Sequence, residues 1–137
     1  MKQKTVLFLC TGNSARSQMA EGLLRHLCGK EFEVFSAGVA PKGVHPAAIQ
    51  VMKEIGIDIS QQKSKHADDL QVKEFDYIIT LCDHAAQNCP IFPGRGERMH
   101  HGFSDPAAVQ GSDHEVLEAF RKVRDELKLF ILGFDTD

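Results

Sequence analysis

Residues 5–17 read TVLFLCTGNSARS, an apolar run followed by a short loop of small polar residues and an arginine. The run at residues 5–9 is apolar at almost every position, as expected of a central parallel strand that is covered on both faces. An amphipathic stretch begins near Ser17. The pattern predicts a strand, a tight loop and the start of a helix, and the rest of the chain is expected to be arranged around them.

The loop has the composition of an oxyanion-binding site. Gly12 and Asn13 tolerate left-handed backbone angles, so successive N–H groups can turn inward and form a nest for an anion. The loop opens onto a helix N-terminus, whose unpaired N–H groups and partial positive charge favour a bound oxyanion. Arg16 adds a forked, permanently charged donor that suits two oxygens of a tetrahedral anion. The predicted oxyanion-binding residues are Thr11, Gly12, Asn13, Ser14, Ala15, Arg16 and Ser17.

Cys10 is the predicted nucleophile. The positive field of the same loop favours its thiolate, which is the nucleophilic form of cysteine. The alternative is that Cys10 is a small buried hydrophobic residue at the end of a strand, as free cysteines usually are. A cysteine and an arginine separated by five residues that include Gly, Asn and Ser form a far more specific pattern than a lone cysteine, and they favour the nucleophile.

Composition excludes several classes of protein. The chain has 137 residues, 42% of them hydrophobic and 26% charged, which is ordinary for a globular protein of one domain, residues 1–137. A net charge of -3 without a basic run gives no electrostatic footprint for nucleic acid or an anionic membrane. No stretch approaches the roughly 20 apolar residues of a membrane span, and the first apolar run lacks a signal-peptide cleavage site. We expect a cytoplasmic protein whose four cysteines are reactive or catalytic.

The remaining elements follow from periodicity and end signals. Apolar residues at three- and four-residue spacing predict helices near Ser17–Cys28, Pro46–Ile55 and Ser112–Gly133. A short helix is expected around Asp68–Phe75, and Asp83–Cys89 has room for two helical turns before Pro90 and Pro93. Apolar or alternating runs predict further strands at residues 31–36, 77–81 and 98–102. Alternating strands and helices predict an α/β three-layer sandwich with right-handed crossovers.

Two further cysteines have different expected places. Cys82 follows the third strand and therefore lies at the carboxyl end of a parallel sheet, where ligands bind in such folds. Cys28 falls on the apolar stripe of the first helix, where it is expected to fill the core.

With these features the chain resembles the low-molecular-weight phosphotyrosine phosphatases, and more closely the arsenate reductases built on that fold. The resemblance spans about Thr5 to Leu132 and rests on the loop, residues 36–38 and 56–60, Cys82, Cys89 and Asp105-Pro106. It implies a four-stranded parallel sheet in the order 2-1-3-4. It also implies that Asp105, which Pro106 biases toward an extended conformation, is the general acid that protonates the leaving oxygen. From the sequence alone, Asp105 as a plain turn residue is an equal alternative.

The resemblance gives Cys82 and Cys89 the roles of a redox relay. In such reductases the residue matching Cys10 attacks arsenate, and the residue matching Cys82 releases arsenite. The disulfide then passes to the pair matching Cys82 and Cys89, which thioredoxin reduces; each transfer is attack of a thiolate on sulfur. The implied function is arsenate reduction in arsenic detoxification, by a monomer that needs no cofactor and no metal. His101 departs from the pattern, since thioredoxin-coupled members often carry Trp there, and we assign it no catalytic role.

Two other functions stay open. A low-molecular-weight tyrosine phosphatase needs only Cys10, Arg16 and Asp105. A sensor of oxyanions or arsenite could use three thiols as soft ligands. Cys82 and Cys89 favour the reductase, and a chain with no Trp and one Tyr offers few aromatic walls for a phosphotyrosine ring. The predicted partners are arsenate or another tetrahedral oxyanion and, transiently, thioredoxin.

A second departure concerns a cation site. Some members of the family bind potassium beside the loop with groups matching Asn13, Glu21 and Ser36, together with a Thr and an Asp. The last two positions are Lys63 and Lys65 in this chain. Either ammonium could occupy the region where relatives hold potassium. We favour Lys65, paired with Glu21 near Asn13, so that a tethered cation replaces a bound one.

Overall fold

The computed structural model describes residues 3–70, 74–82 and 96–133. Its elements are β1 (Lys4–Cys10), α1 (Arg16–Cys28), β2 (Phe32–Gly38), α2 (Pro46–Lys53), the 3-10 helix η1 (Ala67–Asp69), β3 (Tyr77–Thr80), β4 (Glu97–His100), the 3-10 helix η2 (Pro106–Ala108) and α4 (Asp113–Leu132). In these residues, no helix combines the length and the apolarity needed to cross a bilayer.

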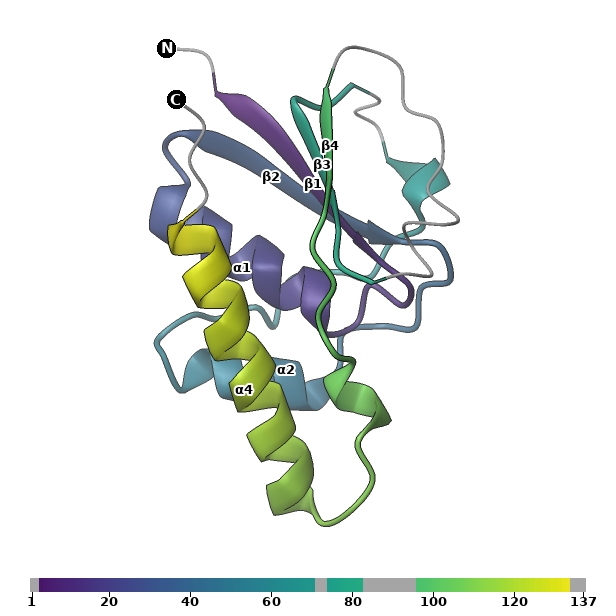
Figure 1. The fold of residues 1–137 in the computed structure, drawn as a ribbon, viewed down its shortest axis with the longest axis vertical. Coiled ribbons are helices and arrows are strands. Elements are labelled where there is room, and N and C mark those ends of the chain that lie inside the picture. Colours follow the sequence, from purple (N-terminus) through teal and green to yellow (C-terminus); the bar gives the residue numbers. More distant parts are fainter. Residues whose placement is uncertain (1–2, 71–73, 83–95, 134–137) are drawn as a thin grey trace.

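The four strands form one parallel sheet in the order β2-β1-β3-β4, which confirms the predicted α/β fold and strand order. β1 is central, with β2 and β3 paired to its two edges, and its residues from Val6 to Cys10 are buried. α1 packs against β1 and β2, and α4 packs against α1 and α2 (Figure 1). Because these strands are parallel, the carboxyl ends of β1, β2 and β3 lie side by side. The segments that leave these strands therefore meet at one edge of the sheet.

The observed element bounds mostly lie within one or two residues of the predicted ones. α2 ends at Lys53, two residues before the predicted Ile55, and the chain then turns at Gly56, whose φ is 80°. The prediction of a helix around Asp68–Phe75 is wrong in the described residues. The His66 side chain caps only a 3-10 turn, and the chain becomes extended at Leu70, which is buried in the core. Residues 71–73 and the helical turns predicted over Asp83–Cys89 lie outside the described residues.

α4 follows its sequence pattern closely. Ser112 accepts from the Glu115 N–H while the Glu115 side chain accepts from the Ser112 N–H, so the predicted capping box is present. Its apolar stripe buries Phe120, Val123 and Leu127 against the other helices.

A cluster of charges holds α4 to the end of α2. Arg124 is nearly buried and donates to the Val51 carbonyl and to Glu54, both at 2.9 Å. Arg121 reaches the same Glu54 carboxylate at 2.7 Å. Hydrogen bonds from Arg121 and Arg124, together with their positive charges, lower the pKa of Glu54 to about 2.

The stability that Glu54 contributes should therefore disappear in acid. A carboxyl group whose pKa is lower in the folded than in the unfolded chain stabilises the fold above its unfolded pKa. That contribution is lost as the pH falls from about 4.5 through about 2. We expect Glu54→Gln to lower the midpoint of urea unfolding at pH 7. As the pH falls through this range, the midpoint of the variant should decline less than that of the wild type. Parallel curves for the two proteins across the range would contradict the prediction.

Candidate active site

The loop of residues 11–15 is held with its carbonyl groups turned outward. The carbonyls of residues 11, 12 and 14 accept from the N–H groups of residues 40, 42 and 45, at 2.8, 2.9 and 3.0 Å. The Asn13 carbonyl accepts from the Gln18 side chain at 3.0 Å. In a planar trans peptide the C=O and the following N–H point in opposite directions, so the N–H groups of the loop face the other side. This arrangement makes the inner face of the loop a row of donors.

That inner face borders a cavity of about 370 Å³. α1 begins beside it at Arg16, and no side chain caps its N-terminus. The first N–H groups of the helix are therefore available to an anion in the cavity, and the helix dipole favours one. The lining residues are Cys10, Thr11, Gly12, Ser14, Ala15, Arg16, residues 42–46, Asp105 and Ala107.

Cys10 ends β1, is almost fully buried, and its Sγ lies 2.9 Å from the Ser17 Oγ. The Asn13 side chain donates to the same Ser17 oxygen at 2.8 Å. The Ser17 hydroxyl therefore contacts both Cys10 and the Asn13 side chain, and either the hydroxyl or the thiol can donate in the contact with the sulfur.

Asn13 is the left-handed residue of the loop, with φ of 44°. Its amide donates to the Ser36 hydroxyl as well as to Ser17, and its side-chain oxygen accepts from the Lys65 N–H at 2.8 Å. These three bonds hold a conformation that costs energy for a residue other than glycine. Gly12, the other residue expected to supply left-handed backbone, has no positive φ in the structure.

Arg16 and Asp105 meet at the edge of the cavity. The Arg16 guanidinium donates to the Phe103 carbonyl at 3.0 Å and lies 3.7 Å from the Asp105 carboxylate. The other Asp105 oxygen accepts from the Ala107 N–H at 2.9 Å, so Asp105 caps η2. Asp105 thus occupies the predicted extended position before Pro106, and its carboxylate also faces the cavity.

Cys82 lies against the loop. It is 8% exposed, and its Sγ is 3.2 Å from the Thr11 Oγ1. Cys82 follows β3, the neighbour of β1, so the pairing of the two strands brings the thiol next to the residue after Cys10. Cys89 lies outside the described residues. Cys28 packs against the core at the last turn of α1, as predicted, and burial raises the pKa of its thiol.

The structure places the predicted oxyanion-binding residues in two groups. Thr11, Gly12, Ser14, Ala15 and Arg16 line the cavity. Asn13 and Ser17 are fully buried behind the loop instead, where their side chains support Cys10 and the backbone.

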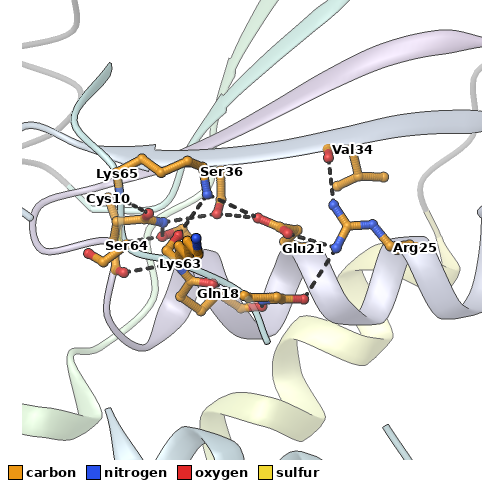
Figure 2. A network of polar contacts seen from close by, with 12 residues as sticks. Cys10, Gln18, Glu21, Arg25, Val34, Ser36, Lys63, Ser64 and Lys65 are labelled. Atoms are coloured by element: carbon orange, nitrogen blue, oxygen red, sulfur yellow. Dashed lines mark hydrogen bonds and ion pairs between the residues drawn. The ribbon is translucent and has the colours of Figure 1, made fainter. Parts of the chain in front are cut away.

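A buried polar network continues behind the loop (Figure 2). The Ser36 hydroxyl donates to Glu21, whose side chain is 5% exposed and forms an ion pair with Arg25 at 2.7 Å. The Lys65 Nζ lies 3.8 Å from Glu21 and donates to the Lys63 carbonyl at 2.7 Å. Burial lowers the pKa of Lys65, and the Glu21 carboxylate acts in the opposite direction. The predicted pairing of Lys65 with Glu21 near Asn13 is confirmed.

This pairing predicts how the protein responds to potassium. The Lys65 ammonium already lies beside Glu21, the carboxylate that would attract a monovalent cation to this network. We expect activity to be unchanged when potassium replaces sodium at constant ionic strength. Initial rates in matched chloride salts measure the effect, and a several-fold activation specific to potassium would contradict the prediction.

Residues 42–46 form a wall of the cavity that sequence reasoning missed. A signal was present, because these residues follow β2, whose carboxyl end lies next to that of β1. No local motif marks them as part of a site. Within residues 3–70, 74–82 and 96–133, no group of three or more His, Cys, Asp or Glu side chains is placed to hold a metal ion.

Comparison with known proteins identifies the family. The model of a family described as low molecular weight phosphotyrosine protein phosphatase matches residues 5–131. This chain belongs to that family. Within the family it groups with proteins named arsenate reductase. The protein of that name from Halalkalibacterium halodurans is 51% identical over 127 residues, which are 93% of this chain and 91% of the relative. The one from Bacillus subtilis is 47% identical over the same shares of the two chains.

Solved structures of family members have the same fold. An arsenate reductase in its oxidized state is 35% identical, with a TM-score of 0.78 and 94% of each chain covered. A thioredoxin-dependent arsenate reductase from Corynebacterium glutamicum is 31% identical, with a TM-score of 0.64. That comparison covers 95% of the present chain and 62% of the Corynebacterium chain.

Proposed function

We propose that this protein reduces arsenate to arsenite, with Cys10 as nucleophile, Cys82 and Cys89 as a disulfide relay, and thioredoxin as the reductant. The observation that carries the proposal is the placement of two cysteines at neighbouring strand ends: Cys10 ends β1, Cys82 follows β3, and the Thr11 hydroxyl lies 3.2 Å from the Cys82 sulfur. The names of the curated relatives support arsenate as the substrate. The thioredoxin dependence of the Corynebacterium protein supports the reductant.

The proposed chemistry balances in two electrons. The Cys10 thiolate attacks arsenic, an As–S bond forms, and one arsenate oxygen leaves as water after protonation. The Cys82 thiolate then attacks the Cys10 sulfur; an S–S bond forms, the As–S bond breaks, and its electron pair stays on arsenic, which leaves as arsenite. Cys89 attacks the Cys82 sulfur and frees Cys10. Two thioredoxin thiols finally reduce the Cys82–Cys89 disulfide, and each exchange depends on thiolate fraction and access.

The remaining residues have roles that follow from their positions. The loop N–H groups and Arg16 would bind the oxyanion, with donors fixed before it arrives. Asp105 would protonate the leaving oxygen, since its carboxylate lines the same cavity and lies 3.7 Å from Arg16. The proposal includes a monomer of one domain. It places the protein in the cytoplasm, because thioredoxin systems keep thiols reduced in that compartment.

The test is NADPH oxidation that depends on arsenate, in the presence of thioredoxin and thioredoxin reductase. We expect steady turnover with stoichiometric arsenite, and none when either thioredoxin or arsenate is left out. Turnover that proceeds equally well without thioredoxin, on another thiol system, would refute the proposed reductant. Absence of arsenite under all conditions would refute the reductase.

A phosphatase is the second candidate, because the family description names that activity and a phosphatase needs only Cys10, Arg16 and Asp105. Hydrolysis of p-nitrophenyl phosphate tests it directly. We expect at most slow hydrolysis beside efficient arsenate reduction. The reverse order of the two activities would favour the phosphatase.

A further inference from the structure

Lys42 lies at the cavity, although no sequence motif includes it. Its N–H donates to the Gly12 carbonyl at 2.9 Å, and its stem passes over Gly12, with Cδ 3.4 Å from the point where a Cβ on Gly12 would be. Gly43 follows with φ of 88°, and this left-handed turn leads the chain along the cavity to His45. The base of the lysine is therefore fixed to the loop, and the residue is exposed and lines the cavity.

The Lys42 ammonium has no ion-pair partner among the described residues. Arg16, the other cation of the cavity, already lies 3.7 Å from Asp105 and donates to the Phe103 carbonyl. Lys42 is thus the cation of this cavity that lacks a protein partner in the described part of the chain.

The charges in the cavity indicate what the Lys42 ammonium can do there. Attack requires Cys10 as a thiolate, and Arg16, the arginine that lines the cavity, already lies beside Asp105. A tetrahedral dianion that enters brings two more negative charges, and like charges at short range repel. The loop N–H groups and the helix dipole offset part of this repulsion. A second full positive charge at the rim offsets more of it and attracts the ion during approach.

We propose that Lys42 is a second cationic contact for the oxyanion and sets a preference for doubly charged tetrahedral inorganic anions. An exposed, flexible lysine on the outer oxygens interacts equally with the bound anion and with the transition state. Such uniform binding changes KM and leaves kcat alone. The contact would strengthen oxyanion binding in reductase and phosphatase chemistry alike, and only the turnover measurement below rests on the proposed function.

The first experiment measures binding without turnover. Inorganic phosphate is titrated calorimetrically into the reduced full-length chain, at fixed ionic strength, for the wild type, Lys42→Gln and Lys42→Arg. We expect Lys42→Gln to weaken phosphate binding by about tenfold, as for loss of one charge-assisted hydrogen bond, and Lys42→Arg to bind nearly as well as the wild type. The matched control is Lys30→Gln, since Lys30 is exposed just before β2, at the opposite end of the sheet, and should change nothing.

Two further measurements separate this role from a structural one. The loss in Lys42→Gln should be larger for sulfate, a tetrahedral dianion, than for perchlorate, a tetrahedral monoanion. KM for arsenate should rise by about the same factor as the phosphate dissociation constant, with kcat unchanged. Equal phosphate affinity of the wild type and Lys42→Gln, a wild type that binds no phosphate, or a fall in kcat with KM unchanged would each overturn the inference. Normal phosphate binding without thioredoxin-dependent turnover would instead refute the proposed function and leave the inference intact.

Discussion

Cys10→Ser is expected to remove arsenate reduction completely. The serine hydroxyl is a far weaker nucleophile than a thiolate, and it can form neither the As–S bond nor the later disulfide. Removing a nucleophile that acts in concert with its surroundings typically costs on the order of 10³-fold or more in rate. Oxyanion binding should largely survive, because the loop N–H groups and Arg16 do not depend on the sulfur. The readouts are arsenate-dependent NADPH oxidation and calorimetric titration with inorganic phosphate.

Cys28→Ser is the matched control for this variant. Cys28 packs against the core at the end of α1, away from the loop, so its replacement should leave the rate unchanged. Near-normal turnover in Cys10→Ser would show that the nucleophile has been assigned to the wrong residue. Loss of phosphate binding together with turnover would show that the thiol, and not the loop, holds the anion.

Cys82→Ser and Cys89→Ser are expected to stop the cycle at two different points. Without Cys82 no thiol attacks the Cys10 sulfur, so arsenate is captured and no arsenite is released. Without Cys89 the first disulfide still forms, so each protein molecule releases one arsenite and then stops. Sustained turnover with thioredoxin should be lost in both variants. Quenched single-turnover reactions distinguish the two variants, when released arsenite is separated from arsenate and quantified per protein molecule.

A disulfide between Cys10 and Cys82 should accumulate in Cys89→Ser, and peptide mass spectrometry can identify it. Continued thioredoxin-dependent turnover of this variant would show that thioredoxin reduces the first disulfide directly and that Cys89 is dispensable. One equivalent of arsenite from Cys82→Ser would remove Cys82 from the relay. Arg16 and the loop residues are unchanged in both proteins, and a serine at position 82 keeps a hydroxyl near Thr11, so phosphate binding should stay normal and serves as the check on folding.

Local sequence was enough for the elements whose signals lie within a few residues of one another. The apolar run before Cys10 predicts a buried strand, because a strand covered on both faces has no position for polar side chains. The Ser112 and Glu115 pair predicts the start of α4, since both partners of the capping box lie within one turn. The helix expected around Asp68–Phe75 was wrong in the described residues because burial of Leu70 in the core outweighed its weak helical pattern.

The chemistry of the loop could also be predicted from the sequence, but the residues that surround the loop could not. Residues 10–17 are contiguous, so their types and spacing alone indicate a nucleophile beside an anion cradle. Tertiary structure decided which of them face the cavity and which, like Asn13 and Ser17, support it from behind. It also brought Thr11 to Cys82, Arg16 to Asp105 and Lys42 to Gly12, pairs that are 71, 89 and 30 positions apart. Such contacts depend on strand order and on how the segments leaving the sheet pack together, and no local periodicity encodes either.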